Sequence, residues 1–253
     1  MAVQTSLLPE EKIFEANAVA RAEWRTSSVF VQRIAAILIS NIEADDKDFS
    51  PMTIPIHRII GSKGGNSYTL ARNIMDDLLN QNVIIPVPCT KRDLIGFHIF
   101  KSKIRYYAQK NAVKVCLNPE LKPYYLELKK NFVAYGLTEF LSLPGTYHQS
   151  MYKLLKSWES EPSCVIDLPE LHRILGTTPS LKKTYSNLDA RVLAPAHKFI
   201  NERTSLKYDY EPQKFGRKVV SVVFTFKSKP KIKKAPPQAK KQTHRGGENR
   251  KTL

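Results

Sequence analysis

The sequence HRIIG at residues 57–61 returns almost unchanged as HRILG at residues 172–176. Before each copy lies a segment whose apolar residues recur at spacings of three and four, residues 29–42 in the first case and residues 147–158 in the second. This spacing is typical of a helix that buries one face. Each pentapeptide predicts a short helix, which its glycine ends before a turn. The chain therefore contains a repeat of helical segments.

The sequence around the two copies predicts the same order of elements. A short strand-like stretch precedes each copy, at residues 52–54 and 164–166, and a second amphipathic helix follows, at residues 67–80 and about residues 184–202. β-rich sequence interrupted by a polar turn comes next in both halves. This is the order of a helix-turn-helix with an appended β-hairpin, the wing. We therefore expect an α+β fold with two tandem winged-helix domains.

The two halves are joined by residues 118–132, which we interpret as a helix because Asn118 is a good N-cap and Pro119 suits the first helical position. A domain boundary is expected within residues 141–145. The end of the chain is rich in Pro and Lys and almost free of apolar residues, which predicts disorder. The expected organisation is an N-terminal arm at residues 1–26, a first winged-helix domain with the inter-domain helix at residues 27–140, a second winged-helix domain at residues 146–227, and a disordered basic tail at residues 228–253.

Two residues interrupt the helix expected at about residues 184–202. Asp189 falls within its apolar arc. Pro195 has no N–H to donate and crowds the carbonyl of Arg191, four residues earlier. We expect the helix to kink or restart at Pro195.

The chain is strongly basic. Its 253 residues include 40 Lys and Arg against 23 Asp and Glu, a formal net charge of +17. Residues 228–253 hold nine basic residues and one acidic residue, or +8, so the remainder still carries +9. A field of this sign favours a polyanionic partner, nucleic acid first and an acidic membrane surface second. The alternative is a basic protein whose charge serves only its solubility.

Other classes of protein find little support in the sequence. There is no GxxxxGK[ST] phosphate-binding motif and the six His are scattered, which argues against an ATPase and a metal-dependent nuclease. Cys89, Cys116 and Cys164 lack metal-ligand spacing and favour a reducing compartment. No apolar run approaches the roughly 20 residues of a membrane span, and the first residues do not resemble a signal peptide. We expect a cytoplasmic protein that is not an enzyme and needs no cofactor or metal.

The second helix of a helix-turn-helix enters the major groove of double-stranded DNA, where Arg can bond guanine and Asn adenine in two places each. Wing tips lie along the backbone or enter the minor groove. The contacts expected in the second domain are Lys182, Lys183, Asn187, Arg191, Lys198, Lys214, Arg217 and Lys218. The contacts expected in the first domain, whose helix face is less basic, are Lys63, Asn66, Ser67, Thr69, Arg72, Asn73, Lys91 and Arg92. The alternative for each is an ordinary solvated surface.

Several of these segments resemble a known family, the iteron-binding plasmid replication initiators (Rep proteins). Residues 118–132 resemble the segment between their two domains, and residues 147–155 resemble the helix that opens the second domain. The strongest likeness is RVLAPA at residues 191–196, followed by GRKV at residues 216–219 and FTF at residues 224–226. The resemblance extends over roughly residues 27–227.

The resemblance implies two winged-helix domains that bind directly repeated origin sequences (iterons) as monomers, and dimers that repress the protein's own gene. It also implies that the protein is no enzyme and recruits a host initiator, helicase and primase. The chain departs from the family at Asp189 and Ala190, where basic residues are usual, and at Ser150, where Arg is usual. Only Arg191, Gly216 and Arg217 carry over as family-type positions. A winged-helix repressor without a replication role is the alternative, and a nuclease a more distant one.

The basic tail provides a test that needs no knowledge of the fold. A chain ended before Ser228 should bind DNA with a flatter dependence on salt concentration, because fewer counterions are released. Its preference among DNA sequences should be unchanged, since the tail is not expected to read bases. Titrations of specific and unrelated duplexes at several salt concentrations measure both quantities. Loss of sequence-specific binding on truncation would contradict this prediction.

Overall fold

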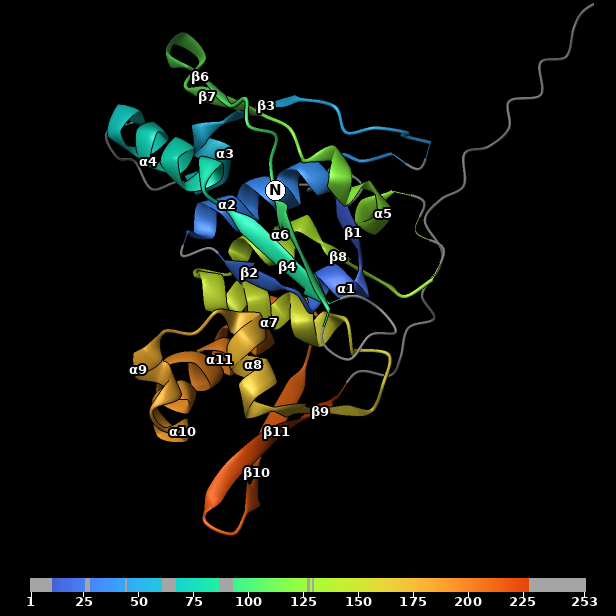
Figure 1. Cartoon of the computed structure of the whole chain (residues 1–253), viewed down its shortest axis with the longest axis vertical. Coiled ribbons are helices and arrows are strands. Elements are labelled where there is room, and N and C mark those ends of the chain that lie inside the picture. Colours follow the sequence, from blue (N-terminus) through green and yellow to red (C-terminus); the bar gives the residue numbers. More distant parts are fainter. Residues whose placement is uncertain are drawn as a thin grey trace, which may run out of the picture.

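The computed structural model describes residues 11–25, 28–43, 45–60, 67–86, 93–126, 128 and 130–227, and of Ser67 and Tyr68 it describes the backbone only (Figure 1). The two domains lie one above the other in Figure 1, with helix α7 (Thr146–Lys156) between them. Several expected features lie outside the described residues: the tail at residues 228–253, Gly61, and the contacts Lys63, Asn66, Lys91 and Arg92.

The first domain has the predicted order of elements. The apolar face of its first helix is buried in the core, including Ile34 and Ile37. The two strands that follow its third helix, at Asn82–Pro86 and Leu94–His98, pair antiparallel and form the wing. The elements are α2 (Val29–Ser40), β3 (Met52–Pro55), α3 (Ile56–Ile60), α4 (Ser67–Leu79), β4 (Asn82–Pro86) and β5 (Leu94–His98).

The first domain also contains strands that the sequence analysis did not anticipate. The hairpin of β6 (Arg105–Tyr107) and β7 (Ala112–Val115), joined through a 3-10 turn at Ala108–Lys110, pairs with β3. The stretch expected as an N-terminal arm differs more. Its described part, residues 11–25, folds onto the domain: β1 (Lys12–Ala16) pairs with β8 (Phe132–Gly136), α1 (Asn17–Ala20) follows, and β2 (Glu23–Arg25) pairs with β4.

The helix expected at residues 118–132 is correct only in its first half. Asn118 caps it as predicted, because its Oδ1 accepts a hydrogen bond from the backbone N–H of Glu120 at 3.1 Å. A 3-10 turn (Pro119–Leu121) leads into α5 (Lys122–Tyr125), and there the helix ends. Phe132 instead begins β8, whose five residue pairs with β1 satisfy the backbone. Pairing with a distant strand overrides the local helical pattern.

The second domain also has the predicted order. Gly176 ends α8 in the left-handed region, with φ of +58°, as expected for the glycine of the pentapeptide. The strands form a sheet in the order β10-β11-β9. The elements, after α6 (Leu137–Ser142) and α7, are β9 (Ser163–Asp167), α8 (Leu168–Leu175), α9 (Pro179–Lys182), α10 (Tyr185–Leu188), α11 (Ala194–Arg203), β10 (Tyr208–Phe215) and β11 (Lys218–Phe226).

The structure explains both residues that interrupt the helix expected at about residues 184–202, the recognition helix of the second domain. A π-helical turn, Asp189–Leu193, joins α10 to α11 immediately before Pro195, so the helix continues through a widened turn. The wider turn relieves the crowding that Pro195 would impose on a regular α-helix. Asp189 tolerates its place in the apolar arc because the hydroxyl of Tyr210 donates a hydrogen bond to its Oδ1 at 2.6 Å.

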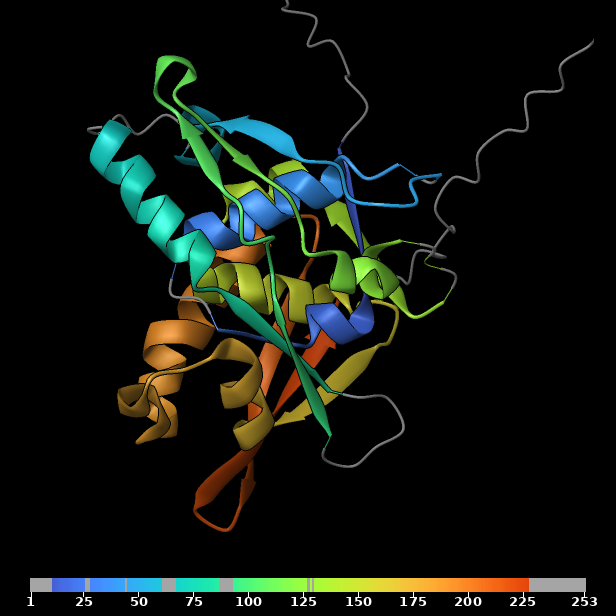
Figure 2. The same cartoon turned by 45° about the horizontal axis from the view of Figure 1, so that its top comes forward.

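The two domains share a buried interface centred on an ion pair. Glu15 of β1 is fully buried, and its Oε2 lies 3.5 Å from Nζ of Lys153 in α7. The hydroxyl of Tyr135 donates to Oε1 of Glu15 at 2.9 Å, and Nζ of Lys153 lies 3.6 Å from the ring centre of Trp24. Burial lowers the pKa of Lys153, and Glu15 opposes that shift. The pair links β1 of the first domain to α7, which lies below α2 in Figure 2.

Removing one partner of this pair should be more harmful than removing both. Lys153→Met leaves a buried carboxylate without its cation and should lower the free energy of unfolding by about 3–5 kcal/mol. Glu15→Gln combined with Lys153→Met should recover much of that loss, because no buried charge remains. Urea unfolding of the two variants measures the difference, with Lys12→Ala on the exposed side of β1 as the control. A double variant no more stable than Lys153→Met would contradict the prediction.

Candidate nucleic-acid interface

The recognition helix of the second domain exposes one polar face. Its opposite face is packed into the core through Leu188, Val192 and Ile200. The π turn changes the angular spacing assumed for a regular helix, yet the expected outward positions other than Asn187 are exposed in the structure. Those exposed positions are Arg191, Ala194 and Lys198. Their contact with DNA stays a prediction.

Asn187 differs from the other residues expected on this face. It is only partly exposed, and its Nδ2 donates to the carbonyl oxygen of Ser180 at 3.3 Å. Its backbone N–H donates to Oγ1 of Thr184, which caps α10. Asn187 therefore holds the turn between α9 and α10, and reading adenine would require its amide to leave Ser180.

The approach to the recognition helix is basic and stays open to solvent. Lys182 and Lys183 are both exposed where α9 ends, just ahead of the capping residue Thr184. The turn before α9 is held by the hydroxyl of Thr177, which lies 2.8 Å from Nδ1 of His172. Burial, and secondly the charge of Lys182, lower the pKa of His172. The two exposed lysines suit a site that attracts phosphates along the backbone.

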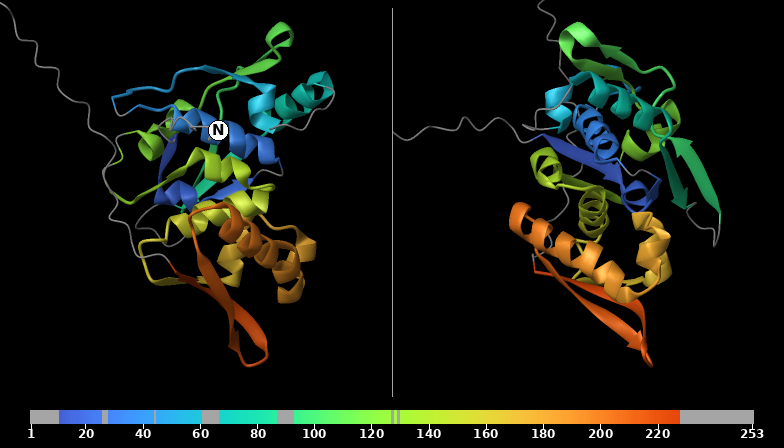
Figure 3. Two further views of the ribbon diagram at one scale, coloured as in Figure 1. Left: turned by 180° about the vertical axis from the view of Figure 1, so that it is seen from behind. Right: turned by 90° about the vertical axis from the view of Figure 1, so that its left-hand side faces the viewer.

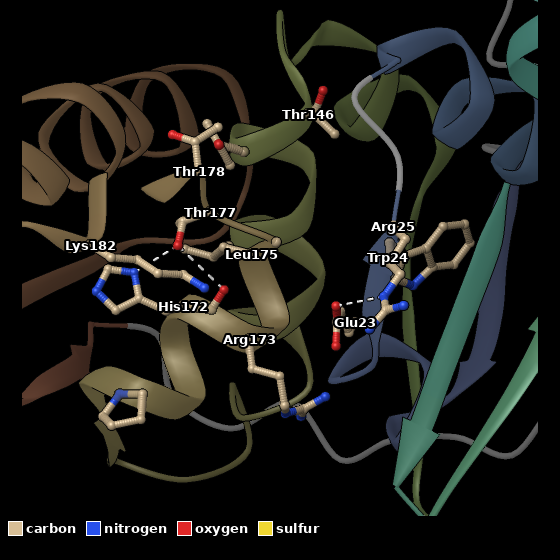
Figure 4. A pocket seen from close by; sticks show the side chains of 13 residues that line it. Glu23, Trp24, Arg25, Thr146, His172, Arg173, Leu175, Thr177, Thr178 and Lys182 are labelled. Atoms are coloured by element: carbon tan, nitrogen blue, oxygen red, sulfur yellow. Dashed lines mark hydrogen bonds and ion pairs between the residues drawn. The ribbon is translucent and has the colours of Figure 1, made fainter. Parts of the chain in front are cut away.

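A cavity of about 610 Å³ lies between the two domains beside this turn (Figure 4). Its wall in the first domain is β2, and its wall in the second domain is α8 with the turn that follows. Two of its cations are neutralised by carboxylates: Arg25 lies 2.9 Å from Glu23, and Arg173 lies 2.6 Å from Glu170. Among the described residues no carboxylate pairs with Lys182. The cavity therefore adds little net charge beyond that of Lys182.

The wing of the second domain is a long hairpin that projects from the body of the molecule (Figure 1). Residues 211–218 are all exposed, among them Lys214, Arg217 and Lys218. Gly216 occupies the first central position of the two-residue turn, with φ of +61°, which a glycine adopts without strain. The base of the hairpin is tied to the recognition helix through Tyr210 and Asp189, and burial with this hydrogen bond raises the pKa of Tyr210.

The first domain offers a smaller and less basic face. On α4, the expected contacts Thr69, Arg72 and Asn73 are exposed, while Ala71 and Ile74 are buried on the other side. Ser67 opens α4, as expected, but its side chain lies outside the described residues. In Figures 1 and 2, α4 and the α9–α10 segment lie toward the same side of the molecule. One DNA duplex along that side would meet the recognition elements of both domains.

The described residues hold no group of three or more His, Cys, Asp or Glu that could bind a metal ion, and no helix long and apolar enough to cross a membrane. Cys116 and Cys164 are free and buried, and burial raises the pKa of Cys164 to about 12, so its thiol is unreactive at neutral pH. The exposed ring of Phe215 stands at the wing tip among the basic residues predicted to contact DNA, although the sequence pattern gives no reason to assign a role to the ring itself.

Comparisons with known proteins agree with this geometry. The family model described as "Initiator Replication protein, WH1" matches residues 12–156, and the model "Initiator Rep protein, WH2" matches residues 167–226. A "Probable replication protein rep" of Bifidobacterium longum (strain NCC 2705) is 26% identical over 137 residues, which are 53% of this chain. The match spans only 46% of that relative.

The fold is similar to that of a solved structure, the Pi initiator protein in complex with iteron DNA. The TM-score is 0.68, and the match covers 87% of this chain and 98% of the Pi chain. At 17% sequence identity, this likeness shows the shared fold rather than shared contacts. It confirms the predicted arrangement of two winged-helix domains in one chain.

Arg191 provides a test of base reading on the exposed face. Arg191→Ala should lower discrimination at a single base pair of the target by about 1–3 kcal/mol, because a bidentate contact is lost. Lys198→Ala, on the same face, is the matched control. It should weaken binding to all sequences alike if Lys198 contacts a phosphate. Affinities for duplexes substituted one base pair at a time give both results, and uniform weakening by Arg191→Ala would contradict base reading.

Proposed function

Because this chain belongs to the family of plasmid replication initiators built from two winged-helix domains, we propose that it starts plasmid replication by binding directly repeated origin sequences through both domains. The observation that carries the proposal is the pair of exposed recognition faces, on α4 and on α10–α11, held toward one side of a body with a shared core. That body is basic even without residues 228–253. The two faces on one side can meet successive grooves of a duplex, and the positive charge attracts its phosphates.

The division of labour follows from the charges of the two faces. The second domain brings Arg191, Lys198 and the basic wing, and supplies most of the attraction to phosphates. The first domain brings Thr69, Arg72 and Asn73, and contributes mainly hydrogen bonds. Two recognition helices about one helical turn apart read successive major grooves on one face of the DNA. A repeat read in this way has a direction, because the two domains differ.

We extend the proposal to the partners that the family resemblance implies. The protein binds its origin repeats as a monomer, represses its own gene as a dimer, and recruits a host initiator, helicase and primase. No step in this scheme needs a catalytic group on this chain, since opening the origin uses binding energy and the host supplies the enzymes. A repressor without a replication role makes the same DNA contacts, so the test must separate replication from binding.

A transformation assay makes that separation. The gene with its flanking DNA is placed on a circle that lacks any other origin, and colonies should appear only when the reading frame is intact. A frameshifted gene on the same circle is the control. Absence of colonies, together with specific binding of the protein to the same flanking DNA, would overturn initiation and favour the repressor.

A footprint on that flanking DNA tests the engagement of both domains. Each protected unit should span two successive major grooves, or about 20 base pairs, because each domain covers about one helical turn. Arg72→Ala and Arg191→Ala should weaken protection at opposite ends of the unit. Protection of about ten base pairs or fewer would show that only one domain binds.

A further inference from the structure

The tip of the second wing carries an aromatic ring in solvent. Phe215 is 82% exposed, more than the other exposed large apolar side chains of the described residues, such as Val165 at 58% and Leu94 at 55%. Single exposed apolar side chains are ordinary on protein surfaces. This ring, however, stands at the end of a projecting hairpin among Lys214, Arg217 and Lys218, where the charge attracts a polyanion.

The hairpin is built to hold its tip in one place. Phe215 pairs with Lys218 across the two-residue turn, and below them the hydroxyl of Ser221 donates to Oε1 of Gln213 at 2.8 Å. At its base, Tyr210 donates to Asp189 of the recognition helix. The position of the wing tip is therefore fixed relative to the recognition helix.

The length of the hairpin matches a dimension of DNA. Five residues separate Tyr210, at the recognition helix, from Phe215, and an extended strand of that length spans about 17 Å. One turn of DNA measures about 34 Å along its axis, so half a turn is about 17 Å. A hairpin of this length reaches from a helix seated in the major groove to the neighbouring minor groove.

We propose that Phe215 is a wedge, which enters the minor groove beside the recognition site, inserts between two adjacent base pairs and bends the duplex. The inference rests on the proposed function, since it requires the recognition helix to be seated in the major groove. Apolar side chains inserted from the minor groove unstack one base step and kink DNA toward the major groove. Lys214, Arg217 and Lys218 surround the ring and neutralise the phosphates that border the minor groove on either side of the wedge.

The wedge adds sequence preference without any hydrogen bond to a base. Pyrimidine–purine steps such as TA and CA unstack at the lowest cost. The protein therefore favours repeats with such a step half a helical turn from the bases that face Arg191. Near an origin that must open, a kinked and partly unstacked step also lowers the cost of separating the strands.

The test uses the full chain and the duplex protected in the footprint, with the fluorescent base 2-aminopurine replacing one adenine at a time. Fluorescence should rise several-fold at one step, about half a turn from the bases assigned to Arg191, because the base is unstacked there. Phe215→Leu should retain the rise and Phe215→Ala should lose it, while both keep the protected segment. Since the side chain is exposed, thermal unfolding of both variants should match that of the natural chain.

Lys218→Ala is the matched control at the same tip. It should reduce the dependence of binding on salt and leave the fluorescence rise in place. An intact footprint without any fluorescence rise, or a rise that survives in Phe215→Ala, would overturn the wedge alone. Failure of the natural chain to protect any segment would overturn the proposed function and the wedge with it. If Phe215→Ala weakened binding only to single-stranded DNA, the ring would stack on separated bases and the duplex wedge would be wrong.

Discussion

The arrangement of the whole molecule depends on one buried ion pair, Glu15 with Lys153. A carboxylate and an ammonium that have left water are stable only when each satisfies the other and their remaining contacts are polar or aromatic. Tyr135 and Trp24 supply those contacts. Because Glu15 belongs to β1 and Lys153 to α7, the pair can form in only one relative placement of these elements. The ion pair thereby sets the relative orientation of the two domains, which apolar packing alone would specify less closely.

Other contacts across the interface support the same placement. Nε2 of Gln32 donates to the hydroxyl of Ser150 at 3.0 Å, and Nε of Arg21 donates to the hydroxyl of Ser157 at 2.8 Å. The guanidinium of Arg21 also lies 3.7 Å from the ring centre of Trp158. Buried apolar side chains form one cluster through both domains, from Ile13 to Phe226. In both views of Figure 3 the elements of the first domain, blue to green, lie above those of the second domain, orange to red. A change in the angle between the recognition helices would therefore have to break specific polar contacts and expose apolar surface.

A polar contact also links the recognition helix to its wing. Asp189 looked like a defect in an amphipathic helix, and Pro195 looked like a break. In the fold, Asp189 is the acceptor that fastens the hairpin through Tyr210, and the π turn before Pro195 lets the helix run on. Departures from local rules are expected where a structure serves a function. Here both departures lie between the reading face and the wing.

The sequence by itself determined the repeat, the order of helices and strands in each winged helix, and the outward face that carries Arg191 and Lys198. Each of these follows from spacings within a few turns of helix or a few residues of strand, which a linear pattern records. Tertiary structure alone decided that α5 ends at Tyr125 and Phe132 begins a strand, that β1 completes the first domain, and that Glu15 meets Lys153. These depend on backbone and charge partners more than a hundred residues apart along the chain. Such partners leave no periodic signal, because their free energy is gained only when the chain has folded back on itself.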